Sequence, residues 1–215
     1  MENPTYKVLL VNGSPNIKGC VARAFDELEK TLNDCGVATE RINVGNKDIR
    51  GCISCMYCRT HGKCVFNDAV NETAPKLAEA DGMIVGTPVY YAGANGQLHS
   101  FMDRLFFSTS GVVDTNQKVG ATVVSSRRAG STSAFDSINH YFTIASMPVV
   151  SSTYWNEVHG FTAEDVDADL EGLQTMRNLA RNTAFLIKAI RAQKEKDGLP
   201  QQEKDKFTNF HTEVR

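Results

Sequence analysis

Residues 7–21 read K-V-L-L-V-N-G-S-P-N-I-K-G-C-V, and this stretch decides the fold class. Its apolar start has the length and composition of a strand that is buried on both faces. A loop rich in glycine, serine and asparagine follows, and apolar residues then recur at helical spacing from Val21 to Leu32. A buried strand, a glycine-rich turn and an amphipathic helix together predict the first unit of a doubly wound parallel sheet.

The same alternation of short apolar runs and helical patterns continues along the chain. We expect further strands at 38–44, 82–87 and 119–124, and a fifth strand that begins at 148–150. Helical spacing predicts crossover helices between the strands, one of them capped by Asp68, and a long closing helix. The predicted architecture is α/β, a flavodoxin-like doubly wound five-stranded parallel sheet with helices on both faces.

Domain organisation follows from the same pattern. We interpret residues 1–193 as one flavodoxin-like domain that carries a cysteine-rich insert at 46–67. Residues 194–215 are charged and loosely patterned, so we expect a C-terminal tail there. This tail ends in Phe207 and Phe210 and is a candidate arm on a partner subunit.

The helix expected around residues 98–106 is strongly apolar. We interpret it as a second candidate surface for self-association. Within it, the adjacent Asp103 and Arg104 are expected to form a structural charge pair.

The composition limits the classes of function. The chain has 215 residues, of which 41% are hydrophobic and 22% charged, and its formal net charge is -2. Such a chain has no basic footprint for nucleic acid and no polybasic patch for a membrane, and it lacks the strongly acidic charge of small electron carriers. No apolar run approaches the length of a membrane span and no secretory signal precedes the first strand, so we expect a cytoplasmic protein.

The loop after the first strand has the composition of an anion site. Its glycines permit close approach of a ligand, and the amides at the start of the next helix carry the positive end of the helix dipole. The candidate donors come from Ser14, Asn16, Gly19, Cys20 and Val21. A phosphate is the natural ligand, although an ordinary glycine-rich turn capped by Ser14 explains the same residues.

Two further loops are expected to leave the sheet at the same edge. After the third strand, paired tyrosines offer flat faces to a planar ring, and Asn95 between two glycines offers an amide to its edge. After the fourth strand, Arg127 and Arg128 follow two serines and can neutralise negative charge. A tyrosine pair that covers the core and a solvated arginine loop are the alternative interpretations.

Four of the six cysteines, Cys52, Cys55, Cys58 and Cys64, lie in the insert, with two, two and five residues between them. This spacing is similar to that of cysteine runs that hold one iron–sulfur cluster. Structural zinc sites favour two well-separated C-x2-C pairs, so zinc fits less well. An insert without metal, packed at a subunit interface, is the third alternative.

Three stretches together resemble one known family. They are G-S-P-N-I-K-G-C at 13–20, T-P-V-Y-Y-A-G-A-N-G-Q-L-H-S-F-M-D-R at 87–104 and C-I-S-C-M-Y-C-R-T-H-G-K-C at 52–64. They look like the NADPH-dependent FMN reductase and iron–sulfur flavoprotein family of the flavodoxin-like superfamily. The resemblance spans the chain to Ile190 and implies that FMN binds at the strand edge.

The resemblance also implies which residues contact FMN. The phosphate would be held by Ser14, Asn16, Gly19, Cys20 and Val21. The isoalloxazine would be lined by Pro88, Val89, Tyr90, Asn95 and Gly96 and, on its other side, by Ser126, Arg127 and Gly130. Cys20 stands where the family commonly has a serine or threonine, so we expect the loss of one phosphate hydrogen bond, about 1.5–3 kcal/mol if it is charge-assisted.

The resemblance implies an FMN-dependent oxidoreductase that uses NAD(P)H to reduce a quinone, nitro-, azo- or similar small acceptor. The alternative is an iron–sulfur flavoprotein that passes electrons from ferredoxin to FMN through a [4Fe-4S] cluster held by Cys52, Cys55, Cys58 and Cys64. A nucleotide-binding regulator without chemistry accounts for neither the tyrosines nor the cysteines.

No nucleophile is needed, because the flavin supplies the chemistry. His159, expected in the loop after the fifth strand, is a candidate proton donor because its pKa range suits that role. The family also implies a homo-oligomer. No motif in the sequence distinguishes NADH from NADPH.

Overall fold

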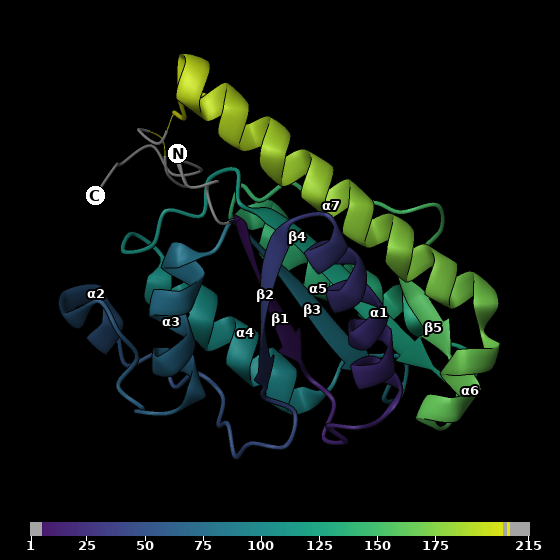
Figure 1. Ribbon diagram of the computed structural model, residues 1–215. Helices are drawn as coiled ribbons and strands as arrows, with labels where there is room; N and C mark the ends of the chain where they lie inside the picture. The colour runs from purple at the N-terminus through teal and green to yellow at the C-terminus, as the bar shows by residue number, and fades with distance from the viewer. Residues whose placement is uncertain (1–5, 204–205, 207–215) are drawn as a thin grey trace.

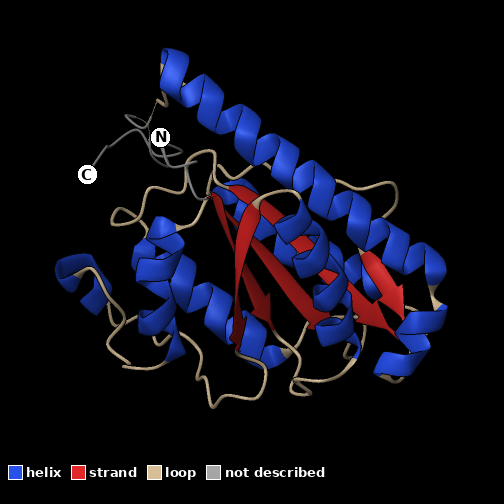
Figure 2. Ribbon diagram, viewed as in Figure 1, coloured by secondary structure: helices blue, strands red, loops and turns tan. Residues whose placement is uncertain are grey.

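The computed structural model describes residues 6–203 and residue 206. The chain forms a five-stranded sheet in the order β2-β1-β3-β4-β5, in which all neighbours run parallel (Figures 1 and 2). The strands are β1 (Tyr6–Asn12), β2 (Val37–Asn43), β3 (Gly82–Pro88), β4 (Val119–Ser126) and β5 (Glu157–His159). The helices are α1 (Cys20–Asp34), α2 (Tyr57–His61), α3 (Ala69–Glu79), α4 (Gly96–Thr109), α5 (Ser131–Ile144), α6 (Ala163–Ala168) and α7 (Leu170–Asp197). The predicted fold class is confirmed.

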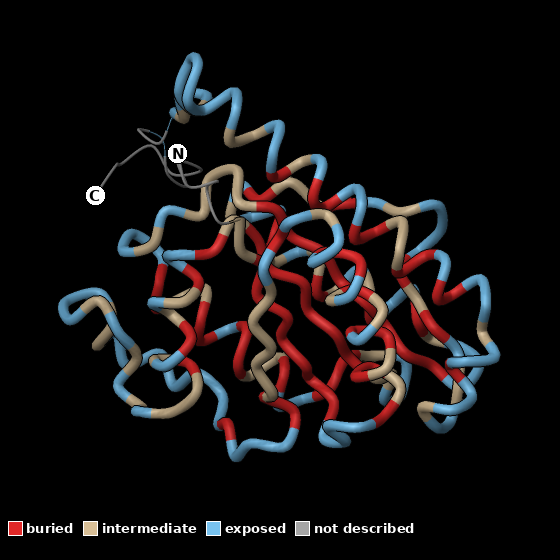
Figure 3. Tube along the Cα trace, in the orientation of Figure 1, coloured by how far each residue is buried: buried red, intermediate tan, exposed pale blue. Residues whose placement is uncertain are grey.

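The helices pack against the two faces of the sheet. On one face, α1, α6 and α7 surround a buried apolar cluster that includes Leu10 and Phe25. On the other face, α3, α4 and α5 surround a second cluster that includes Leu9 and Phe101. Successive strand residues point to opposite faces, which explains why β1 is apolar throughout. Figure 3 shows the buried residues concentrated along the central strands.

The fifth strand begins later in the chain than predicted. Val149 makes only an isolated bridge to Gly120, and the chain then leaves the sheet before it returns as β5. The polar residues 151–153 follow the apolar run and cannot continue a buried strand. The buried Asn156 closes this excursion by donating from its amide to the Val150 carbonyl at 3.5 Å. His159 is consequently the last residue of β5 and does not lie in the loop after it.

Two expectations about packing also change. Four apolar side chains of α4, Leu98, Phe101, Met102 and Leu105, are completely buried, and Phe106 and Phe107 are half-buried, so this helix offers less apolar surface than expected. Helix α7 ends at Asp197, beyond the domain boundary that we set at 193. Phe207 and Phe210 lie outside the described residues. Among the helices of the described chain, none is long and apolar enough to cross a membrane.

Candidate functional site

The loops that follow β1, β3 and β4 meet at the carboxyl edge of the sheet. The Gly13 amide donates to the Gly86 carbonyl at 2.7 Å, which joins the first loop to β3. The Val89 amide donates to the Ser125 carbonyl at 2.9 Å, which joins the second loop to β4. The three loops therefore form one rim at the position where parallel α/β sheets bind ligands. We call it the flavin rim, after the cofactor that the sequence resemblance implies.

Side chains of the first loop hold its own backbone. The Ser14 amide donates to Asn12 Oδ1 at 2.9 Å, and the Asn16 amide donates to Ser14 Oγ at 3.2 Å. Asn16 Oδ1 in turn accepts from the Lys18 amide at 3.1 Å. These are the local turns that asparagine and serine favour. Ser14 and Asn16 thus shape the loop before any ligand binds.

Helix α1 begins with an open N-terminus. Gly19 occupies the N-cap position, no side chain caps the helix among the described residues, and the first turn has no acidic residue. Among the described residues Ser14 accepts from the Asn16 amide and so caps its own turn rather than the helix, which agrees with the alternative of a glycine-rich turn capped by Ser14. The amides of Cys20 and Val21 lie in the turn where donors have no intrahelical partner. Because the helix dipole adds positive potential there, the helix start suits a phosphate.

The thiol of Cys20 is engaged by a different part of the chain. Its Sγ donates to the Thr162 carbonyl at 3.2 Å, in the turn just before α6. The side chain therefore links α1 to the turn after β5. A phosphate at this helix start would rely on backbone donors, in keeping with the absence of a hydroxyl at position 20.

The loop after β3 contains a strained turn. Tyr90 and Gly93 exchange backbone hydrogen bonds of 2.8 and 3.0 Å, and between them Tyr91 and Ala92 have φ values of 50° and 60°. Positive φ at both central positions is typical of a type I′ turn. For residues with a Cβ this conformation costs about 1–2 kcal/mol each. Such strain tends to cluster at ligand-binding loops.

Asn95 and Gly96 end this loop at the start of α4. The buried Asn95 is the N-cap residue, and its Oδ1 accepts from the Gln97 amide at 2.7 Å. Its side chain therefore supports the helix, and a contact of its amide with the ring edge stays a prediction. Gly96 is exposed, and a Cβ built on it would meet no atom within 4 Å, so there is open space beside it.

The loop after β4 packs directly on the loop after β3. Gly130 has a φ of 88°, and a Cβ on it would lie 2.8 Å from Ala92 Cα and 3.2 Å from Val89 Cγ1. Only glycine fits this position without displacing the neighbouring loop. Arg127 beside it is exposed.

Ser126 provides the test of whether the rim fits a bound cofactor. Its side chain is 3% exposed, and its Oγ has no hydrogen-bond partner among the described residues. Buried hydroxyls without a partner are uncommon, because desolvation without a hydrogen bond is unfavourable. A polar ligand at the rim would supply the missing partner, so the residues present fit FMN.

His159 lies beside Ser126 in the register of β4 and β5. Its amide donates to Asp169 Oδ2 at 2.7 Å, and its Nδ1 lies 3.6 Å from the same oxygen. The side chain is 45% exposed, so a ligand at the rim and solvent can both reach it. Asp169 also caps α7 and is a residue that the sequence interpretation missed.

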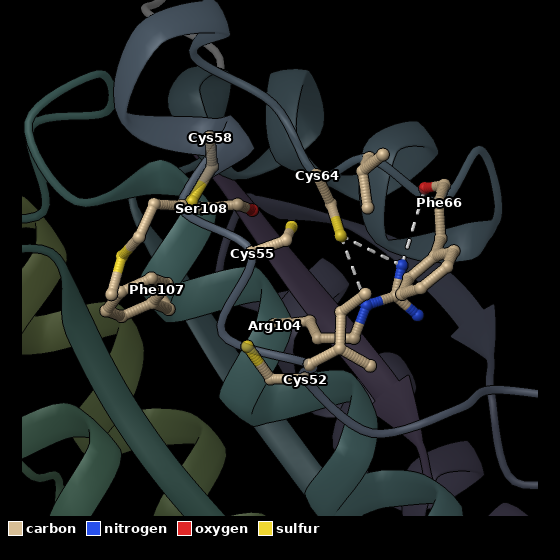
Figure 4. Close-up of a pocket in the computed structure, with 11 residues that line it drawn as sticks. Cys52, Cys55, Cys58, Cys64, Phe66, Arg104, Phe107 and Ser108 are labelled. Atoms are coloured by element: carbon tan, nitrogen blue, oxygen red, sulfur yellow. Dashed lines mark hydrogen bonds between the residues drawn. The ribbon is translucent and has the colours of Figure 1, made fainter.

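The four cysteines of the insert line a second site, a pocket between the insert and α4 (Figure 4). All six cysteines of the chain are free thiols. In the described part of the chain, no group of three or more His, Cys, Asp or Glu side chains is already set to hold a metal ion. The rest of the pocket lining is largely apolar and includes Ile53, Met56, Val65, Phe66 and Phe107. Four thiols around an apolar pocket form a donor set that fits an iron–sulfur cluster.

Arg104 anchors this pocket, and its partner differs from the one predicted. The guanidinium pairs with Asp68 through Nη1 at 2.6 Å and Nη2 at 3.0 Å, and it also donates to Cys64 Sγ. Burial opposes its charge, but hydrogen bonds to Asp68 and Cys64 outweigh burial and raise the pKa of Arg104. Asp103, the expected partner, instead accepts from Tyr141 Oη at 2.5 Å, and burial together with this contact raises the pKa of Tyr141.

A sequence profile described as NADPH-dependent FMN reductase matches residues 6–162. This range contains the flavin-rim loops and the insert.

Two curated relatives match nearly their whole length. An iron–sulfur flavoprotein of Methanocaldococcus jannaschii is 35% identical over 191 residues, which cover 86% of this chain and 99% of the relative. An iron–sulfur flavoprotein of Methanosarcina thermophila is 27% identical over 88% of this chain and 100% of the relative.

Solved structures with low identity share the fold. RosB with a bound 8-demethyl-8-formylriboflavin-5'-phosphate intermediate has a TM-score of 0.69 at 14% identity, over 98% of this chain and 94% of that one. The flavoenzyme FerB of Paracoccus denitrificans, an NAD(P)H:(acceptor) oxidoreductase, has a TM-score of 0.64 at 12% identity, over 86% of this chain and 98% of that one. At these identities the likeness concerns the fold alone.

Proposed function

The chain belongs to the NADPH-dependent FMN reductase family, and from this premise we propose that it is an FMN-dependent oxidoreductase that uses NAD(P)H to reduce a small acceptor. The acceptor is of the quinone, nitro- or azo-compound class. When bound, FMN supplies hydride and electron transfer, and the protein supplies binding and orientation. The six free thiols suit a reducing compartment, so we place the protein in the cytoplasm.

One observation carries this proposal: the Ser126 hydroxyl and the start of α1, which have no hydrogen-bond partner and no side-chain cap within residues 6–203, lie on one rim. The hydroxyl offers a polar contact in a buried position, which a flavin ring requires. The helix start offers an anion site, which the flavin phosphate requires. On this proposal the phosphate is held by Ser14, Asn16, Gly19, Cys20 and Val21. The ring is held by Pro88, Val89, Tyr90, Asn95 and Gly96 on one side and by Ser126, Arg127 and Gly130 on the other.

We assign His159 as the candidate proton donor at the rim. Its exposed ring can exchange protons with solvent, and Asp169 beside Nδ1 orients it. In this role His159 would donate a proton to the acceptor.

The second candidate function uses the insert as an electron entry site. Cys52, Cys55, Cys58 and Cys64 would hold a [4Fe-4S] cluster that receives one electron at a time from a ferredoxin. The iron–sulfur flavoproteins among the relatives support this proposal. The insert at 46–67 also carries four Lys or Arg residues against the single acid Asp48, although the whole chain has a net charge of -2. A basic patch around the cysteines favours an acidic protein partner.

Anaerobic purification with quantitation of flavin and iron tests both proposals. We expect one FMN per chain, NAD(P)H oxidation that depends on an added acceptor, and ping-pong kinetics. Purified protein with no FMN and no stimulation by added FMN would contradict the first proposal. Protein with FMN but no iron and no cluster absorbance would contradict only the second. Comparing NADH and NADPH at equal concentrations identifies the donor.

We further propose that the protein is a homo-oligomer. Trp155, Phe161 and Leu170 are exposed apolar side chains in the segment from the β5 approach to the start of α7. Exposed apolar side chains that form a contiguous patch favour protein contacts. Light scattering at micromolar concentration tests the proposal, and a monomeric mass would contradict it.

A further inference from the structure

Arg104 has no role in the flavin rim, yet it is the largest completely buried side chain of the described chain. It projects from α4 into the cysteine pocket (Figure 4). Charged side chains are almost never fully buried unless they are paired and hydrogen-bonded. At this position each N–H donor of the guanidinium therefore needs a hydrogen-bond partner.

The guanidinium uses two of its donors on one sulfur atom. Nε and Nη2 of Arg104 each lie 3.2 Å from Cys64 Sγ, as the dashed lines in Figure 4 mark. Two parallel N–H groups on one acceptor require the planar fork of arginine, which lysine lacks. No such paired contact from Arg104 is made to Cys52, Cys55 or Cys58 within the described residues.

The remaining donors bind the insert to the protein core. Nη1 and Nη2 hold the carboxylate of Asp68, which caps α3, and the Arg50 and Phe66 carbonyls accept at 3.3 and 3.4 Å. The Phe66 ring packs over the guanidinium at 5.0 Å. Since Asp68 balances its charge, Arg104 acts on Cys64 mainly through directed hydrogen bonds. The Cys64 side chain is therefore held from α4, outside the insert, while Asn71 of α3 holds the Cys64 backbone.

We propose that Arg104 is a positioning residue for the [4Fe-4S] cluster: it holds Cys64 in place as a ligand and makes the cluster easier to reduce. The inference rests on the proposed cluster in the insert. Reduction adds one electron to the cluster, supplied by the ferredoxin donor, and no bond forms or breaks. The added negative charge resides on iron and sulfur, so N–H groups directed at a ligand sulfur stabilise the reduced form.

The test is an EPR-monitored redox titration of the iron-loaded protein and its Arg104→Lys variant. Lysine keeps the positive charge but loses the fork, so we expect cluster reduction to become about tenfold less favourable, which lowers the midpoint potential by about 59 mV for one electron. Arg59→Lys is the matched control, because Arg59 is a surface arginine of the insert that packs on Phe107. We expect this variant to titrate as the wild type does.

Iron and FMN contents of the same samples separate the outcomes. If Arg104→Lys loses iron but retains FMN, and Arg59→Lys retains iron, the results support the proposal that Arg104 holds Cys64. An unchanged potential with full iron overturns the role of Arg104 and leaves the cluster proposal standing. Loss of FMN as well as iron overturns it too, because Arg104 would then support the whole fold. Wild-type protein without iron overturns the cluster proposal and this one together.

Discussion

The flavin rim and the cysteine insert are fixed to the same domain by different means. The rim is joined to the sheet by backbone hydrogen bonds, such as the one from Gly13 to Gly86, and most of its anchoring residues are buried. In the insert, residues 50–56 are all exposed, and Ser54 and Met56 have positive φ values. The insert is attached to α4 mainly through the side chain of Arg104.

This difference teaches which part of the molecule depends on the other. A site built on strand ends inherits the rigidity of the sheet, whereas a site in a loop needs its own anchor. We therefore expect the rim to function without the insert. The insert should depend on the core mainly through two side chains, the buried Arg104 of α4 and Asn71 of α3, which holds the Cys64 backbone.

The largest expected effect comes from replacing Cys52, Cys55, Cys58 and Cys64 together by serine. All bound iron should disappear, whereas the FMN content should not change, because the flavin rim has its own backbone contacts. Stability in the metal-free state should change by no more than about 0.5 kcal/mol at each of the two exposed positions, Cys52 and Cys55. Iron and flavin assays and a thermal melt measure these quantities.

Cys35→Ser is the matched control, because Cys35 lies at the end of α1 and does not line the pocket. It should keep both iron and FMN. Loss of FMN along with iron in the fourfold variant would contradict the expectation that the flavin rim functions without the insert.

The next effect is on the rim alone. Gly130→Ala places a Cβ 2.8 Å from Ala92 Cα and keeps a φ of 88°, which costs an alanine about 1–2 kcal/mol before the clash is counted. We expect FMN to bind at least tenfold more weakly, with no loss of iron from the insert. Fluorescence titration of the apoprotein with FMN measures the affinity.

Gly36→Ala controls for the backbone strain. Gly36 has a φ of 76°, but a Cβ at this position would meet no atom within 4 Å, and the residue lies at the opposite edge of the sheet, before β2. The variant should melt at a lower temperature and bind FMN normally. Equal FMN affinities in the two variants would show that Gly130 is not part of the FMN site.

The smallest expected effect concerns one hydroxyl. Ser126→Ala should weaken FMN binding by about 0.5–1.5 kcal/mol, or roughly two- to twelvefold, because a hydrogen bond to the flavin is lost. The apoprotein should be no less stable, since Ser126 Oγ has no partner to lose among the described residues. Thr183→Val, another buried hydroxyl without a partner in the described chain but on α7, should leave FMN affinity unchanged. A destabilised apoprotein with normal FMN affinity would contradict the assignment.

Local patterns were sufficient for most of the fold. The stretch 7–21 predicted β1, its loop and α1 because strand burial and helical spacing are encoded within a few residues. β5 was misplaced because a three-residue strand has too little pattern to be recognised. The fifth strand was therefore predicted at the apolar run 148–150 instead. The short α2 and α6 were not predicted for the same reason of length.

The site could be predicted as far as its residues are contiguous in sequence. The three rim loops were located from their composition, and the structure brings them to one edge. The assignment of Arg104 to Asp103 was wrong because its true partners, Asp68 and Cys64, lie 36 and 40 residues away in the sequence. A local sequence pattern does not reveal that the Arg104 side chain reaches from α4 to the insert. Asp169 beside His159 was missed for the same reason.

The position of the insert has an evolutionary consequence. In the part of the chain that the structure describes, β2 is an edge strand that pairs only with β1, and the chain enters the insert directly after it. The connection from β2 to β3 crosses no hydrogen-bond ladder, so its length can change without shifting the register of any strand pair. A peptide can therefore be gained or lost here in a single insertion or deletion. The side chains that meet the insert, Arg104 on α4 and Asn71 on α3, must change with it.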